Sequence, residues 1–407
     1  MAAPAAAVTR HVFVTSGKGT GNFDSWPGGY GGGLSGIAAA NAICQSYAFL
    51  SSNQAISSNY ATFRAWISVT GTDAYCNVLG YSGTKGANCG QGGTLPQAGP
   101  WRLANGVTAF GETLDEIVNG DPHVYFPAFL DEDGASVTDV TDAQYWSATG
   151  ADGKGGYVRC NDWSTLSSGV SGSVGTGLGT SVLWTVYKSA TCNESHRLLC
   201  MQMGAGDATA NRWSSPGSIV FVTSDQHPSR LGDDAAANGQ TGVAAGDQIC
   251  RARATAGHLP QPQSFVAWLS DSNSEVATRI TSNGPFRRID GIAVANSKAD
   301  FMDGSIATSI HQTELGTYLD TAPYFASGTD AFGNSTGSDC SDWTSTAVTS
   351  KGVGTAAFAR TAEWADAGTA YSCVYPERLV CVSNKVTVFW DGFDYTGSTA
   401  RWSAHVP

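Results

Sequence analysis

Two short stretches, Cys192-Asn-Glu-Ser-His-Arg-Leu-Leu-Cys200 and Cys373-Val-Tyr-Pro-Glu-Arg-Leu-Val-Cys381, place two cysteines at the same spacing around an Arg-Leu pair. Upstream, Cys160-Asn-Asp-Trp163 matches Cys340-Ser-Asp-Trp343. Further upstream, Gly36-Ile-Ala-Ala-Ala-Asn-Ala-Ile-Cys44 matches Gly242-Val-Ala-Ala-Gly-Asp-Gln-Ile-Cys250. Because these motifs recur in the same order, the sequence indicates one domain that is built twice.

The duplication predicts two domains and a tail. Copy one covers about 11 to 202 and copy two about 219 to 383, and both are near the usual domain size of roughly 100 to 200 residues. The glycine-rich stretch 203–217 is predicted to be a linker. Residues 384–407 have no counterpart in copy one. Their alternating start, Val386-Thr-Val-Phe-Trp390, followed by Asp-Gly, predicts a β-hairpin-like tail.

The cysteine count indicates the compartment. Ten cysteines, an even number, predict five disulfides, which persist in oxidising surroundings. Four cysteines in one copy allow three connectivities, whereas Cys76 and Cys89 occur only in copy one and are close enough to staple one loop. We therefore expect an exported protein, extracellular or at a cell surface. The first residues lack the pattern of a signal peptide, so we expect the numbering to begin on a mature or recombinant form.

Charge and hydropathy exclude two classes of partner. The formal net charge is -12 and only 14% of the residues are charged, whereas a nucleic-acid-binding protein needs a basic stripe. No stretch approaches the roughly 20 apolar residues of a membrane span. The composition, with 50 glycines, is typical of an extracellular, loop-rich domain.

The hydrophobic pattern predicts an α+β fold with short strands and few helices. The alanine-rich runs that end at Cys44 and Cys250 have apolar residues at helical spacing. Alternation and β-branched residues predict strands elsewhere, and each of them occurs in both copies. The predicted strands are 11–15, 65–69 and 197–202 in copy one and 218–223, 267–270 and 378–383 in copy two.

The cysteine pattern resembles that of the C-type-lectin-like superfamily, which has a first cysteine on a helix, a central cysteine and a closing Cys-x7-Cys. More narrowly, Val-Phe-Val-Thr-Ser, Ala-Trp-Leu-Ser, Cys-x-Asp-Trp-Thr and Arg-Leu-x-Cys resemble bacterial endostatin-like surface proteins first noted in leptospires. The resemblance implies two tandem C-type-lectin-like domains, antiparallel strands and adhesion to host or matrix proteins. The disulfides it implies are Cys44 with Cys200, Cys160 with Cys192, Cys250 with Cys381 and Cys340 with Cys373.

Sugar-binding members of this superfamily hold calcium through a carboxylate and an amide on either side of a proline, together with Trp-Asn-Asp before the third cysteine. Gln261-Pro-Gln263 has no carboxylate, and the residues before Cys192 are Tyr187-Lys-Ser-Ala-Thr. We therefore expect no calcium-dependent sugar site and no cofactor. Asp131 and Asp133 are weak candidates for a structural calcium ion, and a solvated acidic turn is the favoured interpretation.

Aromatic residues present in only one copy are candidates for ligand binding. Phe23, Trp26 and Tyr30 lie among glycines, so we expect them to be exposed, although Trp26 folding back to pin the loop is an equal alternative. Trp163 and Trp343, which recur, are expected to pack over disulfides. The neighbouring aspartates, Asp162 and Asp342, are expected to pair with Arg197 and Arg378.

The motifs of hydrolases, metalloproteases and phosphate-binding enzymes are missing from the sequence, so we expect no enzyme. The favoured hypothesis is a secreted or surface-displayed binding or adhesion protein that recognises a protein or glycan ligand. The alternative is a structural subunit of an extracellular layer, sheath or filament whose partners are copies of itself. Its assembly would use the aromatic residues of the tail, Phe389, Trp390 and Tyr395.

Overall fold

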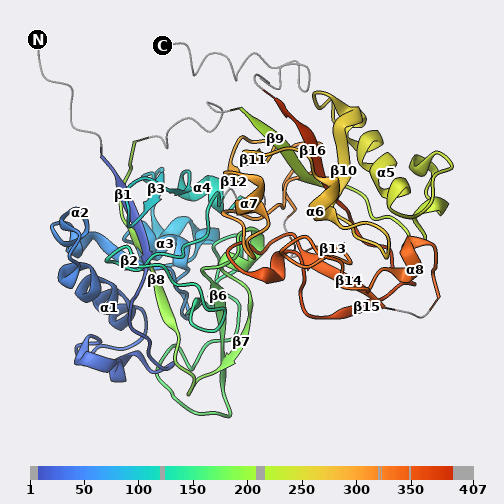
Figure 1. Cartoon of the computed structure of the whole chain (residues 1–407). Helices are drawn as coiled ribbons and strands as arrows, with labels where there is room; N and C mark the ends of the chain where they lie inside the picture. Colours follow the sequence, from blue (N-terminus) through green and yellow to red (C-terminus); the bar gives the residue numbers. More distant parts are fainter. Residues whose placement is uncertain are drawn as a thin grey trace, which may run out of the picture. The chain divides into compact units, whose positions relative to one another are not determined.

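The structure is a computed structural model that describes residues 8–119, 124–207, 216–319, 321, 323–347 and 350–387. It has the mixed α+β composition that the sequence predicts, with short strands, few helices and long connecting segments (Figure 1). The chain divides into two compact units, Met1–Ala210 and Asn211–Pro407, called unit 1 and unit 2 below.

The sheet of unit 1 is built around strand β8 (Arg197–Gln202), in which every residue is buried. Strand β8 pairs with three strands: β1 (Arg10–Val14) and β2 (Phe63–Ala65) run antiparallel to it, and β5 (Gln144–Trp146) runs parallel. The outer strands are β3 (Trp101–Leu103), β4 (Ala109–Gly111), β6 (Ser171–Thr176) and β7 (Lys188–Thr191), which give the order β4-β3-β1-β8-β5-β6-β7.

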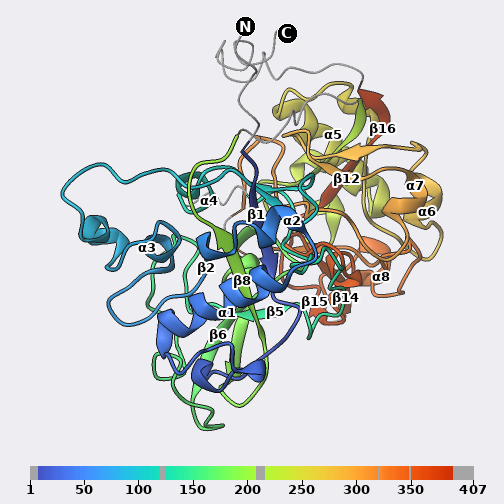
Figure 2. The same cartoon turned by 90° about the vertical axis from the view of Figure 1, so that its left-hand side faces the viewer.

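The main helix of unit 1 is α1 (Gly36–Leu50), which packs on β2 and β8 (Figure 2). Its buried residues Ala40, Ile43 and Tyr47 recur every three or four positions, the spacing that places them on one helical face. The shorter helices are α2 (Gln54–Ser57), α3 (Ala74–Val78) and α4 (Leu114–Ile117). Helix α4 begins with a capping box, in which Thr113 and Glu116 satisfy the free N–H groups.

Unit 2 repeats this topology. Strand β16 (Val380–Thr387) pairs antiparallel with β9 (Gly217–Val222) and β10 (Phe265–Ala267), as β8 does with β1 and β2. Phe325 bridges Arg378 in parallel, as Tyr145 does Arg197 in unit 1. The other elements are α5 (Gly242–Ala256), α6 (Val276–Arg279), β11 (Phe286–Arg287), β12 (Ala293–Ala295), α7 (Lys298–Phe301), β13 (Tyr324–Ala326), α8 (Cys340–Trp343), β14 (Ser350–Thr355) and β15 (Ala370–Ser372).

Five disulfides close the two units, and no described cysteine is free. The pairs are the same as those that the resemblance implies, together with the loop staple: Cys44–Cys200, Cys160–Cys192, Cys76–Cys89, Cys250–Cys381 and Cys340–Cys373. In both units the longest link joins the main helix to the central strand. The five disulfides indicate an oxidising environment. None of the helices in the described part of the chain could span a lipid bilayer.

The predicted tail overlaps the sheet of unit 2. Strand β16 continues to Thr387, and its last two residues pair with Ser218 and Gly217 of β9, so 384–387 belong to the sheet. Strand β9 likewise begins at Gly217, inside the predicted linker. The tail candidates Phe389, Trp390 and Tyr395 lie outside the described residues.

Candidate functional site

The aromatic residues that the sequence singles out for ligand binding are packed into unit 1. Trp26 is 2% exposed, Phe23 is fully buried and Tyr30 is half-buried. Phe23 stacks on Trp163, with 5.0 Å between the ring centroids, and the Trp26 indole N–H lies 3.5 Å from the Tyr47 hydroxyl. The prediction that this loop leaves its aromatic residues exposed is therefore wrong for Phe23 and Trp26. A buried ring offers no face to a ligand.

Gly19, which precedes the loop, explains the burial of Trp26. A Cβ atom at Gly19 would lie 2.4 Å from the ring of Trp26, so the missing side chain creates the space into which Trp26 folds. Tyr30 packs against helix α1, with its ring edge-on to that of Tyr47 and 5.1 Å between the ring centroids. The alternative interpretation, that Trp26 folds back and pins the loop, is the one found.

A different set of apolar side chains is exposed on unit 1. Phe49 is 60% exposed and Leu50 is 58% exposed at the end of α1, and Tyr60, 42% exposed, contacts Phe49 edge-on at 5.1 Å. We call Phe49, Leu50 and Tyr60 the apolar patch. Exposed apolar side chains that touch one another, as Phe49 and Tyr60 do, are typical of protein-binding surfaces, whereas isolated ones are common everywhere.

The sequence contains two signals for the apolar patch that the sequence analysis missed. Residues 34–63 include no charged side chain, although the chain as a whole is acidic. The equivalent positions of unit 2 carry small or non-aromatic residues. Thr255 and Ala256 end helix α5, and Pro262 begins the turn before β10, as Tyr60 begins the turn before β2. The same fold therefore forms without the apolar patch, which indicates that the fold does not require it.

The carboxylates of the acidic loop around Asp131 accept hydrogen bonds from other groups of the chain. Asp131 accepts hydrogen bonds from the backbone N–H groups of Asp133 and Ala135, at 3.1 and 2.8 Å. Asp133 accepts from the N–H and hydroxyl of Ser52, at 2.7 and 2.9 Å, just after helix α1. Within the described residues, no group of three or more His, Cys, Asp or Glu side chains is arranged to hold a metal ion.

The expected ion pair between Asp162 and Arg197 is wrong. Arg197 donates through Nη1 to the carbonyl oxygens of Thr15 and Ser16, so it fastens the segment after β1 to the final strand. Asp162 pairs instead with Arg159, at 2.5 Å. The acceptors are backbone carbonyl groups more than 180 positions away in sequence, and no side-chain pattern marks them.

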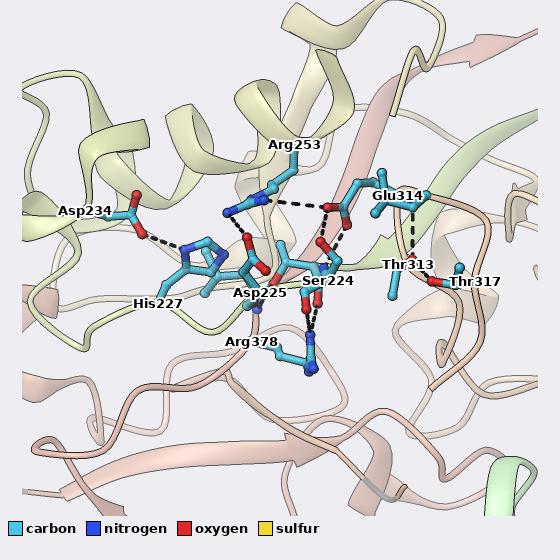
Figure 3. A network of polar contacts seen from close by, with 12 residues as sticks. Ser224, Asp225, His227, Asp234, Arg253, Thr313, Glu314, Thr317 and Arg378 are labelled. Atoms are coloured by element: carbon cyan, nitrogen blue, oxygen red, sulfur yellow. Dashed lines mark hydrogen bonds and ion pairs between the residues drawn. The ribbon is translucent and has the colours of Figure 1, made fainter. Parts of the chain in front are cut away.

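Unit 2 repeats this correction. Arg378 donates to the carbonyl oxygens of Thr223 and Ser224 (Figure 3), while Asp342 accepts the backbone N–H of Ser272 at 2.8 Å. Burial lowers the pKa of Arg378. The repeated contacts identify this arginine as a structural clamp in both units.

A glutamate that the sequence analysis did not identify completes the clamp. Glu132 accepts the backbone N–H of Ser16 at 2.9 Å, and Glu314 accepts that of Ser224 at 2.8 Å. Each carboxylate also accepts the serine hydroxyl. The two stretches share a Glu-x-Gly pattern, Glu132-Asp-Gly134 and Glu314-Leu-Gly316, but the contact of each glutamate with the serine after the first strand is seen only in the structure.

Charged side chains surround the clamp of unit 2 (Figure 3). Arg253 of α5 pairs with Asp225 at 2.5 Å and lies 3.9 Å from Glu314. The Nδ1 atom of His227 lies 2.7 Å from a carboxylate oxygen of Asp234. Burial lowers the pKa of His227. Burial also opposes ionisation of Asp234, but hydrogen bonds from His227 and the Ala236 N–H outweigh it and lower the pKa of Asp234.

These charges replace aromatic packing. Trp26 in unit 1 and Asp234 in unit 2 occupy the same place, between two 3-10 turns that follow the first strand. Gly19 and His227 are also equivalent, because each forms a β-bridge to the segment between the last two cysteines of its unit. Where unit 1 places Trp26 over Gly19, unit 2 therefore places Asp234 beside His227. The charged network is the counterpart of a packed core, which favours a structural role for it.

A buried lysine of unit 2 occupies a second place where unit 1 has aromatic side chains. Lys351 of β14 is fully buried and donates to the Ser229 hydroxyl at 2.9 Å and to the Tyr375 carbonyl. Burial lowers the pKa of Lys351 to about 8, although the carboxylate of Glu377 raises it. The Ser229 hydroxyl in turn donates to the Tyr375 carbonyl at 3.2 Å. Both groups are thus engaged within the protein rather than directed at a substrate.

Unit 1 fills the same place with rings. Gly172 is the equivalent of Lys351, because Gly172 lies opposite Ala190 in the sheet of unit 1 as Lys351 lies opposite Tyr371 in unit 2. A Cβ atom at Gly172 would lie 2.9 Å from Trp146. Trp146 contacts His196 edge-on at 4.6 Å. The equivalents of Trp146 and His196 are Ala326 and Glu377.

His196 is buried, and neither ring nitrogen has a hydrogen-bond partner among the described residues. Burial lowers the pKa of His196 to about 4, although the Glu194 carboxylate, 3.7 Å from Nε2, raises it. The ring is therefore neutral at physiological pH and acts as an apolar side chain.

Comparison with known proteins assigns no function to the chain. No protein-family model matches the chain, and no curated protein sequence is significantly similar to it.

Proposed function

We propose that this chain is a secreted or surface-displayed binding protein without catalytic activity, which adheres to a protein ligand through the apolar patch of unit 1. The observation that carries the proposal is the exposure of Phe49, Leu50 and Tyr60 on a surface segment without charges. Aromatic side chains supply much of the binding free energy at protein interfaces, and charged residues are depleted at interface cores.

A protein ligand fits this patch better than a glycan does. Leu50 and Phe49 bring no hydrogen-bonding group, and Tyr60 brings one hydroxyl, whereas a sugar needs several donors and acceptors to replace its water. A protein ligand with an apolar pocket would bury the patch and release water. The proposed contact needs no calcium.

We further propose that the two units are tandem C-type-lectin-like domains of the endostatin-like kind. The support is the shared disulfide framework, with a helix joined to the central strand and a central loop joined to the closing stretch. The disulfides favour an exported protein, and surface display belongs to the proposal.

The test is a binding screen of the full chain against arrays of extracellular-matrix proteins and glycans, with and without EDTA. We expect a protein ligand whose binding survives EDTA and weakens in the Phe49→Ala, Tyr60→Ala variant. Binding only to glycans, or binding that EDTA abolishes while the protein stays folded, would contradict the proposal.

The second candidate function is a structural subunit of an extracellular layer, sheath or filament. The specific observation in its favour is the uncharged outer edge of strand β15.

A further inference from the structure

Strand β15 is an outer strand of unit 2. In the order β13-β14-β15 it pairs only with β14 among the described residues, and its first residue, Ala370, is exposed. An outer strand presents unpaired N–H and C=O groups, to which another extended segment can add. Proteins that stay monomeric protect such edges.

The equivalent edge of unit 1 is protected in two ways. Strand β7 begins with Lys188, an exposed charge of the kind that opposes strand addition. Near its other end, the carboxylate of Glu194 accepts the backbone N–H of Thr191 at 2.8 Å and its hydroxyl at 2.9 Å. The carboxylate thus occupies a backbone donor that a new strand would need.

Unit 2 has neither protection. By the strand registers, Thr369 stands where unit 1 has Lys188. By the spacing of the closing cysteines, Tyr375 stands where unit 1 has Glu194, and it is 61% exposed. Tyr371 of β15 contacts the exposed Tyr324 at 4.9 Å. The edge is therefore uncharged and lined with tyrosines.

We propose that this edge accepts residues 388–390 (Val-Phe-Trp) of another copy of the chain as an added strand. The alternating pattern that begins at Val386 continues through these residues, and no charged residue occurs between Lys385 and Asp391. Aromatic residues of an added strand would face the tyrosines beside the edge, and cross-strand aromatic pairs stabilise sheets.

The chain's own tail is excluded by geometry. The sheet that contains β15 meets the final strand at Arg378, through the bridge to Phe325. Thr387, the last described residue, lies at the far end of β16, which begins at Val380, two residues after Arg378, and is roughly 23 Å long at 3.3 Å per residue. Residues 388–390 span only about 10 Å, which is too short to return along β16 to the level of Arg378, so the proposed acceptor is the edge of a neighbouring copy.

Such a contact joins two different surfaces, the tail of one copy and the edge of the next. Contacts of this kind close into rings or continue as filaments, and each copy then has one donor and one acceptor. This assembly rests on the second candidate function, the structural subunit, and is independent of ligand binding because it does not use the apolar patch.

The test is sedimentation velocity and negative-stain electron microscopy of the full chain over a range of micromolar concentrations. We expect concentration-dependent polymers for the full chain and monomers for a chain that ends at Thr387. A labelled peptide of residues 386–397 should bind the shortened chain, and Ala370→Lys should weaken that binding about tenfold or more, because lysine on an edge opposes strand addition.

The matched control is Ser189→Lys at the equivalent exposed position of β7, which should leave assembly unchanged. A full chain that remains monomeric at every concentration would overturn the proposal. So would polymers that persist in Ala370→Lys, or a peptide that binds equally to both edges. If the shortened chain misfolds, Ala370→Lys in the full chain still decides the question.

Discussion

At the scale of single residues, the two units solve the same packing problem with different chemistry. Unit 1 uses Trp26 and Trp146 over glycines, and unit 2 uses the His227–Asp234 pair and Lys351. Large side chains over glycine bury more apolar area, whereas buried charges must be paired to offset their desolvation. The comparison separates residues that the fold requires from residues that it tolerates.

We predict that Trp26→Ala destabilises unit 1 by about 3 to 5 kcal/mol, because it empties a fully packed site between Gly19 and Phe23. Urea unfolding followed by far-ultraviolet circular dichroism measures the change. Leu34→Ala, at an exposed position of the same loop, is the control and should change stability little. A Trp26→Ala chain as stable as the original would show that the ring is not part of the core.

We predict that acid destabilises unit 1 through His196. Its pKa falls from 6.5 in the unfolded chain to about 4 in the fold, so the unfolded state binds more protons between these values. Stability is therefore full above pH 6.5 and falls as the pH drops toward 4, by about 3 kcal/mol in total. Unfolding measured at pH 7.5 and 5 should show the loss in the original chain and less of it in His196→Phe.

Glu377, at the equivalent position, responds in the opposite direction. Burial raises the pKa of Glu377, so its contribution to stability is present below the pKa of the unfolded chain and is lost as the pH rises through the pKa of the folded chain.

For His196, an acid-induced loss of stability that is equal in His196→Phe and the original chain would assign the effect to other groups.

At the scale of elements, each unit is held by a helix-to-strand disulfide. Cys250 of α5 and Cys381 of β16 are separated by 131 positions, whereas Cys76 and Cys89 are separated by 13. In the chain-entropy model the cost of losing a disulfide grows slowly with loop length, from about 3 kcal/mol for a short loop to nearly 5 for a long one.

We predict that Cys250→Ala with Cys381→Ala destabilises unit 2 by about 4 to 5 kcal/mol, and that Cys76→Ala with Cys89→Ala costs unit 1 about 3 kcal/mol or less. Chemical unfolding of the two variants beside the original chain measures both changes. Equal losses, or a larger loss for the short loop, would show that local packing rather than chain entropy sets the cost.

The elements most accessible to sequence reasoning were those with strong local patterns. The helices that contain Cys44 and Cys250 and the strands before them follow from periodicity, because their buried faces repeat, although both helices continue six residues beyond the cysteines at which the predicted runs end. The clamp at Arg197 and Glu132 did not follow, since its partners are backbone groups far away in sequence. Exposure of the glycine-rich loop was also predicted wrongly, because glycine permits close packing as readily as it permits exposure.

At the scale of the whole molecule, one topology occurs twice. The pairings of β1, β8, β5 and β6 recur in β9, β16, β13 and β14, although many of the side chains between them differ. A fold that tolerates such different interiors sets few constraints on its surface. Residues exposed in one unit and absent from the other are therefore the best candidates for function, and the apolar patch is one such set.

Binding of a protein ligand by the apolar patch is tested by replacing the exposed end of helix α1 with the residues of unit 2. Phe49→Thr with Leu50→Ala installs the residues found at Thr255 and Ala256. Titration of a ligand identified by the screen should show binding weakened by about 1 to 3 kcal/mol, as expected for a hot spot, with thermal unfolding nearly unchanged. Unchanged affinity in the folded variant would contradict the claim.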